Sequence, residues 1–235
     1  MSAELIELGK KEAARKAVED NVREKMVLGI GSGSTIVFAV RKIAEMNRKH
    51  NLELKCIPSS FQSTQLIIEN KLELASLDEY SEIDLDLDGA DEIDKNLNLI
   101  KGGGGCLVQE KILASNSKKV VIIADFRKNS EFLGQNWKKG VPIEIIPMAN
   151  TPIMNKLKSM GGNPKLRMAT AKSGPLITDN GNFIIDVDFG TIKNPLELNQ
   201  KLLNIPGVVD TGLFVNMASK AYIGNKDGTV IIIQK

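Results

Sequence analysis

The sequence has few aromatic residues, few cysteines and no apolar run long enough to span a membrane. Aromatic residues make up 4% of the 235 residues, which is too few for a surface that stacks nucleic-acid bases. Cys56 and Cys106 lack CxxC spacing, so they indicate neither a zinc site nor a disulfide framework. Residues 1–22 are charged throughout and contain no apolar signal-peptide segment. We therefore expect a soluble, cytoplasmic protein.

An excess of charge of one sign is also missing. The 31 Lys and Arg residues nearly balance the 29 Asp and Glu residues, and no long block of one sign occurs. A balanced chain does not attract polyanions, so we expect no nucleic-acid partner and no membrane partner. His50, the single histidine, follows a lysine-rich stretch and is interpreted as solvated. Without a cluster of metal ligands, the sequence predicts no metal and no cofactor.

Apolar runs of the strand type alternate with amphipathic segments of the helix type over the first 130 residues. The run at 120–125 is continuously apolar, as in strands buried within a parallel sheet. This alternation predicts an α/β fold with a doubly wound, mostly parallel sheet. The expected strands are 26–30, 52–57, 72–74, 83–88, 97–100 and 120–125, and the expected helices are 3–21, 36–49, 65–70 and 106–116.

The order of elements changes after Gly134. From there the sequence predicts the order β-α-β-β-α-β, which is the ferredoxin-like split unit. We therefore expect a small ferredoxin-like α+β domain at 135–210 and a catalytic α/β domain at 1–134 plus 211–235, with the last residues returning to the large sheet. The expected elements are strand 141–148, helix 151–162, strand 165–170, a hairpin over 175–189 that turns at Asp179, Asn180 and Gly181, helix 194–204 and strand 207–215.

The segment GSGST, at 31–35, joins an apolar strand to a helix. In this arrangement free backbone N–H groups and the positive end of the helix dipole face an anion, which makes the segment a phosphate-site candidate. It lacks the lysine of a Walker loop, and Ser34 stands where a dinucleotide motif has its last glycine. A tight turn with helix-capping Ser and Thr explains the same residues, so both interpretations stay open.

Five unusual segments each begin where a predicted strand ends. In open parallel sheets, ligands bind beyond the carboxyl ends of the strands. We therefore expect these segments to converge on one crevice. They are GSGST, PSSFQST, DGADE, KGGGG and ADFRK.

Residues 81–111 contain several carboxylates, one lysine before four consecutive glycines, and a helix-like segment. The alternating aspartates before Gly89 match the opening of a calcium-binding loop. Lys95, however, occupies the twelfth position, where such a loop needs a bidentate Glu. The sequence therefore disfavours a calcium site.

A solvated acidic edge of a sheet is the simplest interpretation of the same aspartates, and it accounts for Asp84 and Asp86. It does not account for Asp88 and Asp91, which flank a glycine at a strand end, or for a lysine directly before four glycines. These residues need a different explanation.

Proton transfer on a small phosphorylated substrate is the third interpretation. Such chemistry needs a base for the C–H proton and fixed donors where the oxyanion develops. Glu110, just past the glycines, is the candidate base, and Glu92 is the weaker rival. Lys101 and the glycine N–H groups are the candidate oxyanion donors.

Five motifs taken together resemble type A ribose-5-phosphate isomerase, most closely its eukaryotic members. They are GIGSGST at 29–35, DGADEID at 88–94, KGGGGCLVQEK at 101–111, ADFRK at 124–128 and IPGVVDTGLF at 205–214. The resemblance covers essentially the whole chain. It implies interconversion of D-ribose 5-phosphate and D-ribulose 5-phosphate through a cis-enediolate, in the non-oxidative pentose phosphate pathway and without a metal. It also implies a homodimer or a homotetramer.

The resemblance further implies roles for individual residues. Glu110 matches the general base that moves a proton between C1 and C2, while Asp88 and Lys101 match the groups that handle the substrate oxygens and ring opening. Lys128 and Lys11 match further substrate lysines, the latter near the phosphate. The other implied substrate-binding residues are Ser32, Gly33, Ser34, Thr35, Gly89, Ala90, Asp91, Gly102, Gly103 and Gly104. A non-catalytic sugar-phosphate-binding regulatory module on the same fold is the alternative.

Overall fold

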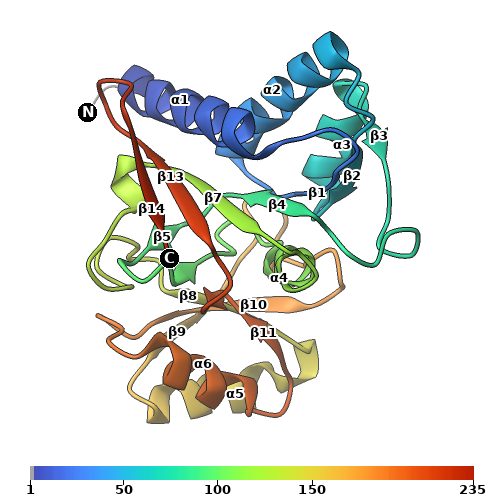
Figure 1. The fold of residues 1–235 in the computed structure, drawn as a ribbon. Helices are drawn as coiled ribbons and strands as arrows, with labels where there is room; N and C mark the ends of the chain where they lie inside the picture. Colours follow the sequence, from blue (N-terminus) through green and yellow to red (C-terminus); the bar gives the residue numbers. More distant parts are fainter. Residues whose placement is uncertain (1–2) are drawn as a thin grey trace.

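A computed structural model describes residues 3–235 and contains a seven-stranded sheet, which lies beneath α1 and α2 in Figure 1. The strand order is β14-β13-β7-β4-β1-β2-β3, and neighbouring strands are parallel except for the last hairpin, β13 and β14. The predicted doubly wound, mostly parallel α/β fold is confirmed, and the C-terminal residues do return to the large sheet. Its strands are β1 Val27–Ile30, β2 Lys55–Pro58, β3 Glu73–Leu74, β4 Leu85–Asp88, β7 Val120–Asp125, β13 Lys220–Gly224 and β14 Val230–Gln234.

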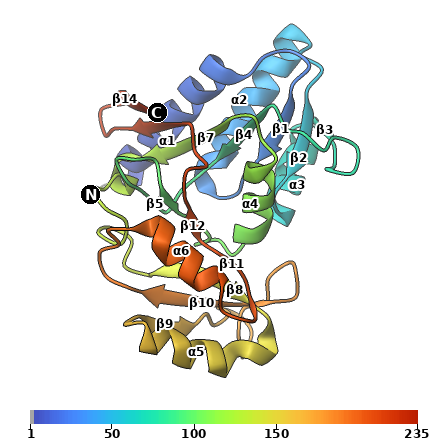
Figure 2. The same cartoon turned by 60° about the horizontal axis from the view of Figure 1, so that its bottom comes forward.

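Helices cover both faces of this sheet (Figures 1 and 2). Apolar residues of α1, α2 and α3 form one buried cluster with Leu85 and Leu87 of β4. On the opposite face, Leu113 and Ala114 of α4 pack into two further clusters. The four helices are α1 Ala3–Asn21, α2 Ser34–His50, α3 Phe61–Glu69 and α4 Leu107–Ser115. No helix among residues 3–235 is long and apolar enough to cross a membrane.

Strand β4 lies in the middle of the sheet, between β7 and β1. Its leucines enter the cluster beneath α1 and α2, so its aspartates point to the opposite face, where α4 lies. Asp86 is 1% exposed. The interpretation of this segment as a solvated sheet edge is therefore wrong for Asp86, because the alternation separates two buried faces.

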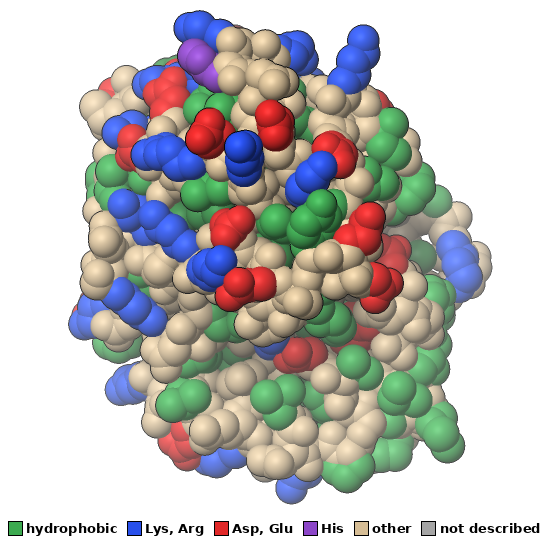
Figure 3. Space-filling view, turned by 45° about the vertical axis from the view of Figure 1, so that its right-hand side comes forward, with side chains coloured by type: hydrophobic (Ala, Val, Ile, Leu, Met, Phe, Trp, Pro, Cys, Tyr) green, Lys and Arg blue, Asp and Glu red, His purple; other side chains and the backbone are tan. Residues whose placement is uncertain are grey.

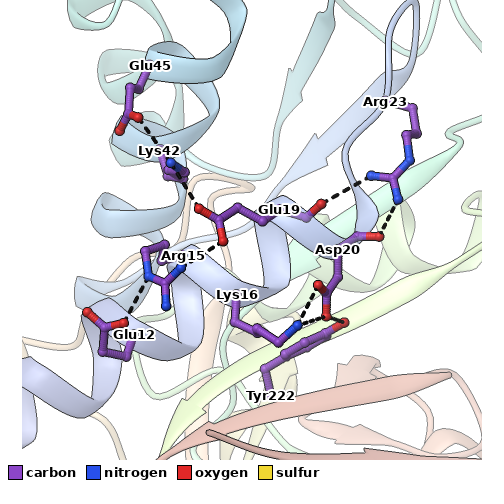
Figure 4. A network of polar contacts seen from close by, with 9 residues as sticks. All are labelled: Glu12, Arg15, Lys16, Glu19, Asp20, Arg23, Lys42, Glu45 and Tyr222. Carbon is purple, nitrogen blue, oxygen red and sulfur yellow. Dashed lines mark hydrogen bonds and ion pairs between the residues drawn. The ribbon is translucent and has the colours of Figure 1, made fainter. Parts of the chain in front are cut away.

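Helix α1 is held on the sheet by its polar side as well as its alanines (Figure 4). Glu19 forms an ion pair with Lys42 of α2 at 3.1 Å. Asp20 accepts a hydrogen bond of 2.9 Å from the hydroxyl of Tyr222 in β13. These contacts fix the helix against two neighbouring elements. Over the face drawn in Figure 3, acidic and basic side chains are interspersed.

A four-stranded antiparallel sheet has the order β11-β8-β10-β9. Two helices cover one of its faces and share an apolar cluster with it, while α4 contacts β8 and β11 (Figure 2). The division of the chain into domains at 1–134 plus 211–235 and 135–210 stays a prediction. The elements are β8 Val141–Ile145, α5 Asn150–Ser159, β9 Asn163–Leu166, β10 Phe183–Asp188, α6 Pro195–Leu203 and β11 Val208–Thr211, with a 3-10 turn at Pro147–Ala149.

The predicted hairpin over 175–189 is wrong in its first arm. Only the second arm is a strand, β10, and it pairs with β8 and β9. The residues before it form a turn, in which the Thr178 amide donates to the Asn182 carbonyl over 2.9 Å. The side chains of both residues donate to Glu144 of β8, so polar contacts replace a strand ladder here.

The predicted strand 207–215 is divided between two sheets at Gly212. Its second part, β12 Leu213–Phe214, joins β6 Leu99–Ile100 and β5 Glu92–Ile93 in a three-stranded sheet. A Cβ on Gly212 would lie 2.2 Å from the Lys101 carbonyl oxygen, so only glycine permits this approach. The Lys101 amide also donates to the Gly212 carbonyl over 2.8 Å. The small sheet thereby fixes the backbone of Lys101.

Candidate active site

A cavity of about 370 Å³ opens at the carboxyl ends of β1, β2, β4 and β7. The five segments that follow the predicted strands all contribute to its wall, which agrees with the crevice expected from the sequence. Among the sequence-predicted residues, those that line it are Ser32, Gly33, Ser34, Thr35, Gly89, Ala90, Asp91, Lys101, Gly102, Gly103, Gly104, Glu110 and Lys128.

Two glycines of β1 and its loop make room for the aspartates of β4. A Cβ on Gly31 would lie 1.9 Å from Asp88 Oδ1, and a Cβ on Gly29 would lie 2.7 Å from Asp86 Oδ1. Asp88 Oδ1 accepts hydrogen bonds from the amides of Ser32 at 3.2 Å and Gly89 at 2.7 Å. These two glycines are therefore needed to admit carboxylates from the neighbouring strand.

The start of α2 provides the phosphate-site candidate. The residue before the helix is Gly33, with φ of 102°, and no side chain caps the helix. The open interpretation of Ser and Thr as ordinary helix caps is therefore wrong. The first two residues of α2, Ser34 and Thr35, line the cavity. A helix of this length presents a partial positive charge there, which suits an anion.

Lys10 approaches the same place from α1, and Lys11 does not. Lys10 is buried, lines the cavity and donates to Ser34 Oγ over 3.0 Å, while its second contact is Glu7 at 2.7 Å. Lys11 is exposed and lies outside the cavity wall. The structure therefore brings Lys10 to the cavity, in the place that the sequence predicted for Lys11. Adjacent helical residues point about 100° apart, and Lys10 shares the face of the buried alanines of α1.

Lys101 connects two carboxylates at the base of the cavity. Its Nζ lies 2.7 Å from Asp88 Oδ2 and 3.1 Å from Glu110 Oε2, and it donates to the Gly89 carbonyl over 2.8 Å. All three side chains are buried, with Lys101 4% exposed. They come from three elements, namely the end of β6, the end of β4 and the first turn of α4. Asp88 is not part of the cavity wall and lies behind Lys101.

The buried setting changes the acid–base properties of this group. Burial and the charge of Asp88 together raise the pKa of Glu110 to about 7, although Lys101 opposes the rise. Burial lowers the pKa of Lys101, but the carboxylates of Asp88 and Glu110 outweigh that effect, so its pKa is raised. Lys101 is therefore cationic in the resting site, and Glu110 can gain and lose a proton near neutral pH.

The glycine loop after Lys101 is held by Asp91. The Gly103 amide donates to Asp91 Oδ2 over 2.7 Å, and a Cβ on Gly103 would lie 2.7 Å from the same carboxylate. Gly102 has φ of 94°, a conformation that favours glycine. A Cβ on Gly104 would meet no atom within 4 Å, so this part of the loop is open to the cavity.

Glu92, the rival base, is fully buried away from the cavity wall. It accepts hydrogen bonds from Ser130 Oγ and from the amides of Gly134 and Asn136, each at 2.6 Å. These contacts connect β5 to the loop before β8. We therefore assign Glu92 a structural role, and Glu110 is the candidate base.

Several residues of the cavity wall were not predicted. The wall residues at the ends of β2 and β7 lie in the segments PSSFQST and ADFRK, which the sequence already placed at strand ends. Their positions alone could have indicated that they line the cavity. Asp179 lies in the turn before β10, which the sequence presented as an ordinary hairpin turn. Cys106 precedes α4 and carried no signal. The additional wall residues are Lys10, Ser60, Phe61, Gln62, Cys106, Asp125, Arg127 and Asp179.

Known proteins resemble this chain over most of its length. The family model of ribose 5-phosphate isomerase A (phosphoriboisomerase A) matches residues 55–228. The chain is 56% identical to a ribose-5-phosphate isomerase from Sus scrofa over 230 residues, covering 97% of this chain and 75% of that protein. It is 56% identical over 223 residues to the one from Dictyostelium discoideum, covering 94% and 95% of the two chains.

Solved structures show the same relationship. The ribose 5-phosphate isomerase A from Methanocaldococcus jannaschii superposes with a TM-score of 0.91 at 40% identity, covering 97% of this chain and 99% of that one. A D-ribose-5-phosphate isomerase in complex with phospho-erythronic acid superposes with a TM-score of 0.94 at 39% identity, covering 98% and 99%. Sequence and structure together show that the chain belongs to the ribose 5-phosphate isomerase A family.

Proposed function

We propose that this chain interconverts D-ribose 5-phosphate and D-ribulose 5-phosphate through a cis-enediolate. The observation that carries the proposal is the buried contact of Lys101 with both Asp88 and Glu110 at the base of the cavity. An isomerase of this kind needs a base with a pKa near neutrality beside a fixed positive charge, and Glu110 and Lys101 have these properties.

The phosphate of the substrate binds at the N-terminus of α2 in this proposal. Lys10 supplies a full positive charge there, and the first amides of the helix supply hydrogen-bond donors. Lys128 lies on the wall near the end of β7 and adds a second cation. The sugar carbonyl then extends toward Lys101, at the other end of the cavity. A structural relative binds phospho-erythronic acid, which likewise carries a phosphate and oxygen-bearing carbons.

Ring opening of the cyclic sugar requires one proton on the ring oxygen and removal of one from the O1 hydroxyl. The Lys101 ammonium gives a proton to the ring oxygen as the C1–O4 bond breaks, and Glu110 takes the O1 proton. Because the two groups lie 3.1 Å apart, Glu110 returns its proton to Lys101 and both recover their starting charge. Asp88 stabilises the ammonium from behind.

Isomerisation of the open chain uses the same two groups. Glu110 removes the proton from C2, and the electron pair forms the C1–C2 double bond while negative charge develops on O1. Lys101 and the amides of the glycine loop stabilise that charge. The proton of the O2 hydroxyl passes to O1, and Glu110 returns its proton to C1. The product carries its carbonyl at C2, so atoms and charges balance without another reactant.

The decisive experiment is proton NMR of ribose 5-phosphate with the purified protein in D₂O. Because a single base moves the proton while exchanging with solvent, we expect deuterium to enter C2 of ribose 5-phosphate and C1 of ribulose 5-phosphate. Binding of ribose 5-phosphate without any exchange at C2 would overturn the proposal and favour a sugar-phosphate-binding regulatory module.

Three further parts belong to the proposal. A place in the pentose phosphate pathway and a homodimer or homotetramer come from the family resemblance, and a cytoplasmic location comes from the composition of the sequence. Ile231 and Ile232 of the edge strand β14 are 48% and 42% exposed, which supports association of chains. Sedimentation equilibrium of the purified chain tests the assembly, and a monomer at micromolar concentration would contradict it.

A further inference from the structure

Arg167 connects the four-stranded sheet to the glycine loop of the cavity. It directly follows β9, and its side chain is 14% exposed. On one side, its Nε and Nη2 form a two-pronged contact with Asp186 of β10, at 2.8 and 2.5 Å. On the other side, its Nη1 donates to the carbonyls of Gly102 at 2.9 Å and Gly103 at 3.3 Å. Its guanidinium therefore links β10 to two successive loop peptides.

The geometry of the peptide bond turns these contacts into a constraint on the amides. In a trans peptide the carbonyl and the following N–H point in opposite directions. Since the Gly102 carbonyl faces Arg167, the Gly103 amide must face away, and it donates to Asp91 over 2.7 Å. By the same rule, the Gly103 carbonyl on Arg167 turns the Gly104 amide to the opposite side. Gly104 is part of the cavity wall.

Glycine peptides need such a constraint because they have few steric preferences of their own. No atom lies within 4 Å of the position that a Cβ on Gly104 would take, so side-chain packing does not hold the loop there. A flipped peptide would direct a carbonyl oxygen at the substrate, where negative charge develops. A planar, always charged guanidinium with donors in a fixed fork can hold Asp186 and both carbonyls together, whereas a lysine cannot.

We propose that Arg167 is a positioning residue, which holds the Gly102 and Gly103 carbonyls so that the Gly104 amide faces the developing oxyanion. The inference rests on the proposed isomerase function. It means that a residue of the four-stranded sheet, outside the cavity wall, sets the geometry of the oxyanion donors. Arg167 itself does not touch the substrate.

The test compares Arg167→Lys with Lys165→Met, which removes an exposed cation of β9 that is not part of the cavity wall. We expect Arg167→Lys to lower kcat about tenfold or more with little change in KM, because the loop amide acts on the transition state. Lys165→Met should leave both constants unchanged. Affinity for phospho-erythronic acid should fall more in Arg167→Lys than affinity for inorganic phosphate.

Chemical rescue separates positioning from folding. Arg167→Ala leaves room for a free guanidinium ion between Asp186 and the loop, so a sub-denaturing concentration of guanidinium should restore part of kcat, whereas the same concentration of sodium chloride should not. An Arg167→Lys variant with wild-type kcat would overturn the inference, as would an Arg167→Ala variant that guanidinium does not rescue. Failure of the proposed function differs from both outcomes, because the wild-type protein would then show no exchange at C2.

Discussion

The activity of this chain should fall as the pH drops below neutral, because Glu110 must be ionised to remove the C2 proton. Burial of its carboxyl group, together with the charge of Asp88, raises its pKa to about 7. For one group with this pKa, about half of the enzyme is active at pH 7 and about a tenth at pH 6. The expected loss of kcat between pH 8 and pH 6 is therefore about tenfold.

The assay measures kcat at saturating substrate over this pH range in wild type and in Glu110→Gln. The phosphate of the substrate titrates at about pH 6, so it adds a second fall of kcat on the acid side of the pH–rate profile, here called the phosphate limb. The amide of Glu110→Gln cannot accept the proton, so kcat should fall by about 10² to 10⁴-fold. Only the phosphate limb should remain in that variant. Glu110→Asp keeps a carboxylate on a shorter side chain and should retain both limbs at reduced kcat.

A second variant should shift the acid limb that Glu110 gives to the pH–rate profile, without removing the base. Asp88→Asn removes a negative charge that raises the pKa of Glu110 and leaves Lys101 with one carboxylate partner. Both changes favour the ionised form of Glu110, so the acid limb should shift to lower pH while kcat falls. The reasoning is refuted if wild type has its limb at about pH 4.3, the ordinary range of a glutamate. It is also refuted if Glu110→Gln keeps the limb of the wild type.

Three other substitutions test the rest of the site. Lys10→Met should raise KM for ribose 5-phosphate at least about tenfold, because it removes a charge-assisted phosphate contact worth about 1.5 to 3 kcal/mol. Lys11→Met should leave KM unchanged. Equal effects of the two variants in initial-rate assays would contradict the assignment of Lys10 to the phosphate site. Asp86→Asn should reduce the dependence of stability on pH. Burial and neighbouring Asp88 raise the pKa of Asp86 above its unfolded value, so the free energy of unfolding falls as pH rises from about 4 through the folded pKa. Urea titrations at acid and neutral pH measure this slope, and an unchanged slope in the variant would show that Asp86 is ionised in the fold. Gly31→Ala should destabilise the protein by about 1 to 3 kcal/mol and lower kcat, since the added methyl group collides with the Asp88 carboxylate. Denaturation and rate measurements test this expectation. A variant with wild-type stability and activity would disprove the close approach of Gly31 to Asp88.

The parallel sheet could be predicted because its signal is local. The continuous apolar run of β7 is buried over all six residues, as strands covered on both faces are. The burial of Asp86 could not be predicted in this way. Its side chain occupies space that Gly29 leaves free, and the two residues are far apart in the sequence. An alternating pattern in the sequence does not say whether the polar face meets water or a second layer.

The same limit applies to the candidate site. The motif positions of Lys101 and Glu110 indicated that they meet, because both adjoin the same glycine loop. Lys10 and Lys11 are adjacent in a helix without a distinctive motif, and the alanine-rich face decides between them. Arg167 carried no signal, since its partners Gly102 and Gly103 are backbone carbonyls more than 60 residues away. Contacts from a side chain to a distant backbone leave no pattern in a sequence.

The two carboxylates beside Lys101 differ in their partners, and this difference explains why one of them can act as a base. Asp88 accepts hydrogen bonds from two backbone amides in addition to its ion pair, so its charge is held by fixed donors. Among residues 3–235, Glu110 contacts the single ammonium of Lys101, and its burial is otherwise uncompensated. Two carboxyl groups in contrasting environments take up separate acid–base roles. The scarcity of partners around Glu110 is thus what allows it to carry a proton from one carbon to the next.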